Sequence, residues 1–228
     1  MAAPSHVAII PDGNRRWARK HNLPEFEGHR ISAEKILPSI IDSLMAEGVE
    51  YFTFWALSTE NVTRRSPREY ANLVNLMRMF LRKRTHELNK KNIRMKIIGD
   101  VTIFPDDIRK LIDDAIEKTK NNTGMTVIFG INYGGRDEIL RAIRKLTAGN
   151  TTAEITCEKF REYLDTKDVP DPDLIIRTGG EHRISGFMLW QSEYAEYAFM
   201  DKLFPEITEA DCKGVIKNFL SRERRYGK

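Results

Sequence analysis

Four polar, glycine-containing segments each follow an apolar run, and their residue types are suited to binding phosphates. The segments are Asp12–Trp17, Ser58–Asn61, Asn132–Arg136 and Arg177–Ser185. Glycine lets backbone N–H groups approach an anion closely, and arginine binds phosphate oxygens in pairs through its planar guanidinium. Carboxylates such as those of Asp12 and Glu196 are hard ligands, and Mg²⁺ takes one or two of them together with substrate phosphates. The segments therefore predict binding of phosphate esters with a metal.

Each segment alone also has a simpler interpretation. Asp12-Gly13-Asn14 is typical of a turn, and the pair Arg15-Arg16 is typical of a solvated surface. The sequence has no Gly-x-x-x-x-Gly-Lys-Ser/Thr loop, and no Gly-x-Gly-x-x-Gly follows its first apolar run. It also has no His-Glu-x-x-His and no Gly-x-Ser-x-Gly motif. Nucleotide binding by those loops and the corresponding hydrolase chemistries are therefore disfavoured.

Strands that alternate with helices are expected to bring the four segments to one edge of a sheet. Short apolar runs predict strands at His6–Pro11, Tyr51–Leu57, Ile93–Ile98, Met125–Asn132 and Asp173–Arg177, with a further candidate strand at Gly186–Trp190. Amphipathic spacing predicts helices at Ser32–Glu47, from Ser66-Pro67 to about Lys91, at Pro105–Asn121, from Gly135 to about Thr147, at Glu158–Leu164 and at Thr208–Arg225. This order predicts an α/β fold with a central, mainly parallel six-stranded sheet flanked by helices. Ligands of such sheets bind at the carboxyl ends of the strands.

Length and composition limit the classes of protein. The chain has 228 residues, which suits a single domain spanning residues 1–228. Its net charge of +4 is explained either by solvated helix faces or by an anionic partner such as nucleic acid, anionic lipid or a phosphorylated substrate. A nucleic-acid partner is not predicted, because no stripe of basic residues with interleaved aromatics is present.

Cysteine content and hydropathy bear on location. The only cysteines, Cys157 and Cys212, are isolated, which excludes a disulfide framework or zinc site and favours a reducing cytoplasm. No run of about 18 apolar residues is present to span a membrane, and Met1–Ser5 leads directly into a strand-like run without a signal peptide. The chain would visit a bilayer rather than span it.

Taken together and in order, the segments resemble the cis-prenyltransferases of the undecaprenyl diphosphate synthase type. The matching stretches are His6–Ala18, Gly28-His29, Leu57–Asn61, Ile97–Asp100, Asn132–Arg136, Asp173–Ser185, Phe187–Gln191, Tyr194–Glu196 and Arg222–Gly227. The resemblance implies that family's fold with an apolar tunnel. It also implies Mg²⁺-dependent condensation of isopentenyl diphosphate with an allylic prenyl diphosphate of the farnesyl or geranylgeranyl class. The product would be a Z-polyprenyl diphosphate for lipid carrier synthesis, with release of diphosphate.

The resemblance also implies roles for individual residues. Asp12 would hold Mg²⁺ against a substrate diphosphate, and Glu196 would complete the metal site. Ser58 and Asn61 would lie beside the reacting carbons and help to remove a proton. The residues implied or considered to bind substrate are Gly13, Asn14, Arg15, Arg16 and His29 on the allylic side, Arg177, Arg183 and Ser185 on the isopentenyl side, and Trp17 and Arg64 without assignment to a side. Trp17 is equally typical of a core tryptophan.

The C-terminal end of the chain bears on assembly. In the family that it resembles, Arg225 and Gly227 would reach across an interface to the partner's active site, although a charged helix end explains Arg222–Arg225 without any partner. Family members are homodimers, or heterodimers with a largely inactive subunit. Because both the tail and Asp12 are present, an active homodimer is predicted rather than a non-catalytic prenyl-diphosphate-binding subunit. It would be cytoplasmic or peripheral at the membrane surface, with its product delivered to the membrane.

Three features depart from the family pattern. Glu25 stands where the family usually has an arginine, four residues before His29. The run Arg30–Ala33 replaces a small-residue pattern containing glycine, and Val62 replaces a tryptophan common in bacterial members. The departures leave the allylic substrate preference open. The product length is also open, although the small Ala56 beside the Ser58 segment permits a medium or long chain.

Overall fold

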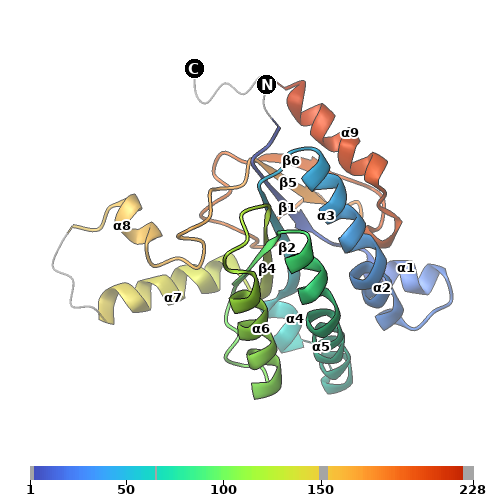
Figure 1. Cartoon of the computed structure of the whole chain (residues 1–228), viewed down its shortest axis with the longest axis horizontal. Helices are drawn as coiled ribbons and strands as arrows, with labels where there is room; N and C mark the ends of the chain where they lie inside the picture. Colours follow the sequence, from blue (N-terminus) through green and yellow to red (C-terminus); the bar gives the residue numbers. More distant parts are fainter. Residues whose placement is uncertain (1–2, 65, 149–153, 223–228) are drawn as a thin grey trace.

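A computed structural model describes residues 3–64, 66–148 and 154–222 of the chain (Figure 1). Within these residues a six-stranded sheet has the order β3-β4-β2-β1-β5-β6, and every neighbouring pair is parallel. The strands are β1 His6–Ile10, β2 Tyr51–Ser58, β3 Arg94–Ile98, β4 Thr126–Tyr133, β5 Leu174–Arg177 and β6 Glu196–Phe199. The prediction of a parallel α/β sheet is thereby confirmed for the described part of the chain.

The prediction of a strand at Gly186–Trp190 is wrong. Ser185, Gly186 and Met188 have φ angles of 51°, 83° and 45°, and these left-handed values are incompatible with an extended strand. The segment forms turns instead. The sixth strand of the sheet is β6, which pairs with β5.

Each predicted helix has a counterpart in the structure, with shifted ends. The counterparts are α3 Leu37–Ala46, α5 Pro67–Lys90, α6 Asp106–Thr119, α7 Gly135–Ala148, α8 Cys157–Arg161 and α9 Glu209–Leu220. Helix α5 begins with a capping box, in which the Ser66 hydroxyl accepts from the Glu69 backbone N–H at 3.3 Å and the Glu69 carboxylate accepts from the Ser66 N–H at 3.0 Å. The predicted helix Thr208–Arg225 is observed only to Leu220, and residues 223–225 lie outside the described residues.

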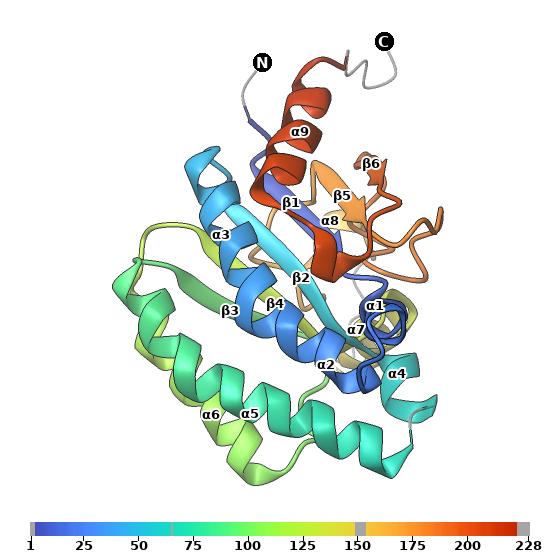
Figure 2. The ribbon, with the colours of Figure 1, turned by 90° about the vertical axis from the view of Figure 1, so that its right-hand side faces the viewer.

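Three short helices were not predicted. They are α1 Asn14–Lys20, α2 Glu25–Ile31 and α4 Thr59–Arg64, and a π-helical turn over Ser32–Ile36 joins α2 to α3. Figure 2 shows α1, α2 and α4 gathered near the carboxyl ends of β1 and β2. Helices α1 and α2 pack closely at Gly28, where a side chain would clash with the carbonyl oxygen of Asn14.

The two faces of the sheet bury different partners. In β1, Val7 and Ile9 belong to the large core shared with α3, α5, α6 and α9, whereas Ala8 and Ile10 belong to a second core with Phe187 and Met188. This alternation follows from the period of two along a strand. Figure 2 shows α3 and α5 lying across the face of the large core.

Strand β1 lies at the point in the sheet where the order of the strands reverses. The chain leaves β1 for β2 on one side, and β5 is added later on the other side. Ile10 at the end of β1 pairs with Arg177 at the end of β5. A crevice for a ligand is expected at such a switch point. In the described residues, no helix has the length and apolarity needed to cross a bilayer.

A buried histidine makes the stability of this fold depend on pH. His6 is fully buried, its Nδ1 donates to the Pro170 carbonyl oxygen at 2.7 Å, and its Nε2 lies 2.8 Å from the Thr53 hydroxyl. Burial lowers the pKa of His6 to about 4. The unfolded chain binds a proton at this side chain near pH 6.5 while the folded chain does not, so stability is lost as the pH falls below about 6.5.

We therefore expect the free energy of unfolding to fall by about 2 kcal/mol between pH 7 and pH 5 because of His6 alone. The variant His6→Gln should be less stable at pH 7. Its free energy of unfolding should fall by about 2 kcal/mol less than that of the wild type between pH 7 and pH 5. Urea unfolding of the wild type, His6→Gln and His21→Gln, a control at an exposed histidine, measures the effect. Equal pH dependence in His6→Gln and the wild type would contradict this assignment.

Candidate active site

A cavity of about 950 Å³ has a polar mouth and an apolar interior. Its polar residues lie at or after the carboxyl ends of β1, β2 and β5, or belong to the short helices α1, α2 and α4 or to the π-helical turn after α2. They are Asp12, Asn14, Arg15, Arg16, Arg19, His29, Ser32, Ser58, Glu60, Asn61, Arg64, Arg177, Glu181, Arg183 and Ser185. The convergence expected of the segments after β1, β2 and β5 is therefore observed.

The interior of the cavity lies between the sheet and α5. It is lined by Leu37, Phe54, Leu57, Leu73, Leu76, Met77, Phe80, Leu81, Met95, Phe129 and Ile131. Phe54 and Phe129 are register partners in β2 and β4, and Met95 lies level with Val127, two residues deeper. The Phe80 ring meets the Phe129 ring edge-on, with 5.4 Å between centroids. Such a cavity can hold a hydrocarbon chain whose polar end stays at the mouth.

The carboxylate of Asp12 sits between two guanidinium groups at the mouth. Its Oδ2 accepts from Arg177 Nη2 at 2.9 Å, and its Oδ1 lies 3.2 Å from Arg16 Nη2. The Asp12 side chain is 31% exposed, whereas that of Arg177 is 6% exposed. Two cations around one anion leave a positive charge at the mouth that can attract a phosphate.

Two nitrogens of the Arg177 guanidinium are hydrogen-bonded, and the third has no partner among the described residues. Its Nη1 donates to the Arg183 carbonyl oxygen at 2.6 Å and to the Ser185 hydroxyl at 2.8 Å. Its Nε is buried and has no hydrogen-bond partner among the described residues. A buried donor without an acceptor costs about 1–3 kcal/mol, so an anion that reaches this N–H is favoured.

The loop that carries Asp12 is fixed by β5 and by the 3₁₀ turn Phe204–Glu206. The Asp12 carbonyl oxygen accepts from the Thr178 hydroxyl at 2.7 Å and from the Phe204 N–H at 2.9 Å. Gly13 has a φ of 105°, and a side chain there would lie 2.7 Å from the Leu203 Cδ2 atom. Only glycine fits this position without strain.

Asn14 is oriented by two partners. Its Nδ2 donates to the Pro11 carbonyl oxygen at 2.9 Å, and its Oδ1 accepts from the Ser32 hydroxyl of the π-helical turn. Asn14 and Ser32 are both buried and line the cavity beside His29. The first loop is therefore tied to the helical segment that follows it.

Ser58 and Asn61 lie together at the end of β2. The Ser58 hydroxyl accepts from the Asn61 N–H at 3.1 Å and caps the N-terminus of α4. Ser58 is buried and Asn61 is exposed, and both line the cavity, as do Ala56 and Arg64. The structure therefore brings these predicted residues to the same mouth as Asp12.

Two predicted residues lie elsewhere. Trp17 does not line the cavity but stacks on His21, with 4.2 Å between ring centroids. Glu196 is the first residue of β6, level with Leu174 and Val7, and pairs with Arg222 at 2.7 Å. Val7 lies three residues before the end of β1 and Asp12 two residues beyond that end, so Glu196 and Asp12 are offset by about 10 Å or more along the strand direction. The prediction that Glu196 completes a metal site with Asp12 is thus wrong within one chain, since the sheet register places Glu196 at the opposite end of its strand.

Other cavity residues were missed by the sequence analysis, and two predicted ones fall outside the structure. Glu60 and Glu181 line the mouth within segments already singled out. Their charge and position in those segments were the available signal. Arg19 was not missed: with Arg15 it was a candidate to replace the family arginine lost at Glu25, and it lines the mouth one helical turn after Arg15. Arg225 and Gly227 lie outside the described residues.

The donor set at the mouth fits a metal that arrives with its substrate. In the described ranges, no group of three or more His, Cys, Asp or Glu side chains could enclose a metal. Asp12 offers a partly exposed carboxylate surrounded by arginines. Mg²⁺ commonly binds through one or two carboxylates plus substrate phosphates, and this arrangement suits that mode.

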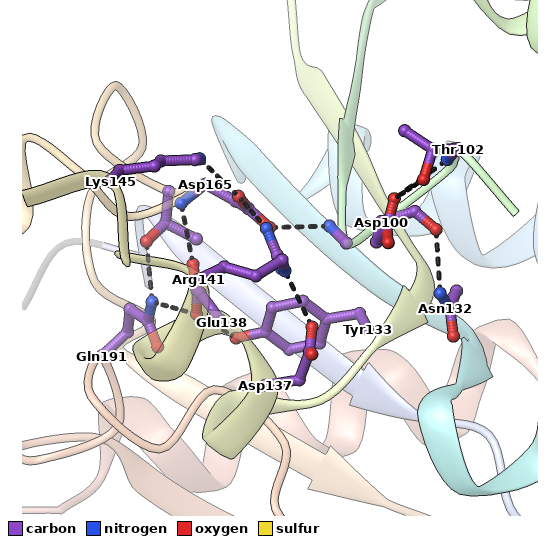
Figure 3. A network of polar contacts seen from close by, with 12 residues as sticks. Asp100, Thr102, Asn132, Tyr133, Asp137, Glu138, Arg141, Lys145, Asp165 and Gln191 are labelled. Carbon is purple, nitrogen blue, oxygen red and sulfur yellow. Dashed lines mark hydrogen bonds and ion pairs between the residues drawn. The ribbon is translucent and has the colours of Figure 1, made fainter. Parts of the chain in front are cut away.

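The Asn132–Arg136 segment is anchored by a buried polar network rather than opened to the cavity (Figure 3). The Tyr133 hydroxyl donates to Glu138 Oε2 at 2.6 Å, and Gln191 Nε2 donates to the same oxygen at 3.0 Å. Burial raises the pKa of both Tyr133 and Glu138. The Tyr133 carbonyl oxygen accepts from Trp55 Nε1 at 3.0 Å, and Trp55 lines the cavity, so the network supports the cavity wall.

The second half of this network is an ion pair. Arg141 donates to both carboxylate oxygens of Asp165 at 2.7 and 2.6 Å, and Asp165 also accepts from the Gly99 N–H at 2.9 Å. Burial raises the pKa of Asp165, but the hydrogen bonds and charge of Arg141 outweigh it, and the pKa is lowered overall. This pair ties α7 to the loops after β3 and α8.

The fold and the site together define a class: a parallel α/β protein with an anion-binding mouth over an apolar cavity. Comparison with known proteins specifies it further. Residues 10–227 match the Prenyltransf family, that of the undecaprenyl diphosphate synthases, and the chain belongs to this family. The predicted family is thereby confirmed.

Individual relatives agree over nearly the whole chain. The chain is 42% identical to the isoprenyl transferase of Rhizobium meliloti, covering 98% of this chain and 92% of that protein. It is 39% identical to the ditrans,polycis-undecaprenyl-diphosphate synthase ((2E,6E)-farnesyl-diphosphate specific) of Micrococcus luteus, with 98% and 91% covered. The crystal structure of lavandulyl diphosphate synthase from Lavandula x intermedia in complex with dimethylallyl diphosphate superimposes with a TM-score of 0.94, 35% identity and 99% coverage of both chains.

The ion pair in the network supports a stability prediction. The variant Arg141→Ala leaves the mostly buried Asp165 without its partner and should lower the free energy of unfolding by about 3 kcal/mol. The exposed Arg144 on the same helix is the matched control, and Arg144→Ala should change it by less than about 0.5 kcal/mol. Urea unfolding compares them, and equal effects of the two variants would contradict the importance of the pair.

Proposed function

We propose that the chain is a cis-prenyltransferase that joins isopentenyl diphosphate to an allylic prenyl diphosphate. The product is a Z-polyprenyl diphosphate, and diphosphate is released. The observation that carries this proposal is the Asp12 carboxylate between Arg16 and Arg177 at the mouth of an apolar cavity. The names of the relatives, isoprenyl transferase and undecaprenyl diphosphate synthase, support the same reaction.

The chemistry requires stabilisation of a leaving group. When the allylic C1–O bond breaks, positive charge spreads over the allylic carbons and negative charge develops on the departing diphosphate. Guanidinium groups already placed around that site stabilise the charge without rearranging. The double bond of isopentenyl diphosphate then supplies the electron pair for the new C–C bond, and transfer of a proton from its C2 to the departing diphosphate restores a double bond.

Two diphosphates can be assigned to the two sides of the mouth. On the α1 side, Arg15, Arg16, Arg19 and His29 would bind the allylic diphosphate together with Gly13 and Asn14. On the β5 side, Arg177, Arg183 and Ser185 would bind the isopentenyl diphosphate, and the hydrogen bonds of Arg177 to Arg183 and Ser185 support their acting together. Holding both substrates in line contributes much of the rate in such reactions.

Asp12 would hold Mg²⁺ against a diphosphate, where the metal would neutralise charge on the leaving group. The residues Ser58 and Asn61 would orient the isopentenyl group for loss of its proton. Their position at the end of β2, on the same mouth as Asp12, supports that role.

The apolar interior would take the prenyl chain. The aliphatic and aromatic lining excludes water from the allylic cation, and burial of the chain contributes about 25 cal/mol per Å² of apolar surface. The primer would be a farnesyl or geranylgeranyl diphosphate. The small, exposed Ala56 leaves room at the entrance of the cavity.

Assembly and location belong to the same proposal. An active homodimer would let the C-terminal Arg225 and Gly227 reach a partner's mouth. The enzyme would work in the cytoplasm or at the membrane surface, and its product would pass to the membrane.

A conservative change at Asp12 tests the proposal. We expect Asp12→Asn to reduce turnover by about 100-fold or more while the fold persists, because a charged metal ligand is lost but a hydrogen-bond acceptor for Arg177 remains. The assay follows radiolabelled isopentenyl diphosphate into product with farnesyl diphosphate and Mg²⁺, with circular dichroism as the check on folding. Asp42→Asn, at a surface aspartate paired with Lys91, is the control.

Near-normal turnover of Asp12→Asn would contradict the assignment of the site. Absence of any Mg²⁺-dependent product from the pure wild-type protein would overturn the enzyme proposal in favour of a non-catalytic prenyl-diphosphate-binding subunit.

The interior of the cavity leads to a second prediction. Phe80→Ala removes a ring that packs edge-on against Phe129, and it should extend the cavity and lengthen the products by one or more isoprene units. The neighbouring Met79, which is 49% exposed and does not line the cavity, provides the control Met79→Ala. Chromatography against polyprenol standards reads the lengths, and identical product distributions in the two variants would contradict the position of the chain in this cavity.

A further inference from the structure

Glu25 forms ion pairs with two arginines of the cavity mouth but does not line the cavity itself. It is the first residue of α2, and its Oε2 accepts from Arg15 Nε while its Oε1 lies 3.3 Å from Arg19 Nη1. Arg15 and Arg19 line the cavity, but Glu25 does not. The carboxylate therefore acts on the mouth only through these two guanidinium groups and through its charge.

With the contacts of Glu25, every arginine of α1 has an ion-pair partner, and Arg15 and Arg19 share one carboxylate. The remaining arginine of this helix, Arg16, is paired with Asp12. All three arginines of α1 thus face a carboxylate before any ligand binds. On the β5 side the arrangement differs, because Arg177 keeps a buried N–H without a partner among the described residues.

These ion pairs are too exposed to serve mainly the stability of the fold. The side chains of Arg15, Arg19 and Glu25 are 47%, 61% and 34% exposed. Surface pairs of this kind contribute little to folding. An incoming diphosphate, in contrast, carries several negative charges, so it must compete with Glu25 for the same two arginines and is repelled by the carboxylate.

We propose that Glu25 is a positioning residue that weakens retention of the diphosphate on the α1 side of the mouth, by competing with it for Arg15 and Arg19. This inference rests on the proposed function. After each condensation, the lengthened chain keeps the diphosphate that came from the isopentenyl unit. It must then be bound as the next allylic substrate, or it leaves. Glu25 therefore favours release and limits the length of the product.

The isosteric variant Glu25→Gln tests this role. It removes the charge and keeps the shape of the side chain. We expect the KM for the allylic diphosphate to fall about fivefold, with the KM for isopentenyl diphosphate and the kcat at saturating substrates nearly unchanged. The product distribution should shift to longer chains under limiting allylic primer. Inorganic diphosphate should also bind about fivefold more tightly by calorimetry.

Glu27→Gln is the matched control. Glu27 lies on the same helix, and its loss changes the net charge equally, but it pairs with Arg30 at 2.7 Å, and neither residue lines the cavity. The control should leave the KM for the allylic diphosphate, the product length and the binding of inorganic diphosphate within about twofold of the wild type. A specific effect of Glu25→Gln over Glu27→Gln separates the contact with Arg15 and Arg19 from a change in overall charge.

The result that overturns the inference is an unchanged or higher KM for the allylic diphosphate in Glu25→Gln, together with unchanged or weaker binding of inorganic diphosphate. Equal effects of Glu25→Gln and Glu27→Gln would also overturn it. Failure of the proposed function gives a different result, namely no condensation by the wild type or any variant. The binding of inorganic diphosphate then still decides whether Glu25 competes for the two arginines.

Discussion

The ion pair between Arg177 and Asp12 is the interaction on which the site depends. A guanidinium that is 6% exposed needs an opposite charge and filled hydrogen bonds, because an unpaired buried charge is strongly destabilising. The parallel pairing of β1 with β5 places Ile10 beside Arg177, so the next residues of the first loop bring the carboxylate of Asp12 to it. Thr178 and Phe204 hold the loop in this position through its backbone. The same geometry leaves the arginines in excess at the mouth, which prepares it for a polyanionic ligand.

The rest of the fold keeps the charged residues of the cavity mouth apart from the apolar residues of its interior. The large core between the sheet and α3, α5, α6 and α9 surrounds the cavity interior, whose residues belong to strands and helices that would pack against one another in any such fold. The opposite face carries the network of Tyr133, Glu138 and Gln191, which holds the Asn132–Arg136 segment and, through Trp55, one wall of the cavity (Figure 3). A polar network thus lies behind the sheet, and the charged side chains of the site are concentrated at its carboxyl edge. An apolar chain with a diphosphate head matches that division.

Much of this arrangement could be predicted from the sequence, because apolar runs separated by helices specify a parallel sheet and place the following polar segments at one edge. The convergence of Asp12, Ser58 and Arg177 followed from that rule. Helices α1 and α2 escaped prediction because each has only two apolar side chains among polar ones, too few to show a helical apolar period. The turn at Gly186 was mistaken for a strand because its apolar residues conceal left-handed backbone angles. The distance of Glu196 from Asp12 depends on the register of β6, and the ion pairs of Glu25 depend on how α2 packs on α1. Neither can be deduced from local pattern.

The most direct test of the account is a crystal structure of the protein with isopentenyl diphosphate, an unreactive allylic thiodiphosphate and Mg²⁺. The account predicts two diphosphates at one mouth, with the metal on Asp12, one diphosphate accepting a hydrogen bond from Arg177 and the other on the α1 side beside Arg16. It also predicts the prenyl chain between α5 and the sheet, near Phe80 and Phe129. Diphosphates bound away from Asp12 and Arg177, with the cavity empty of hydrocarbon, would contradict it.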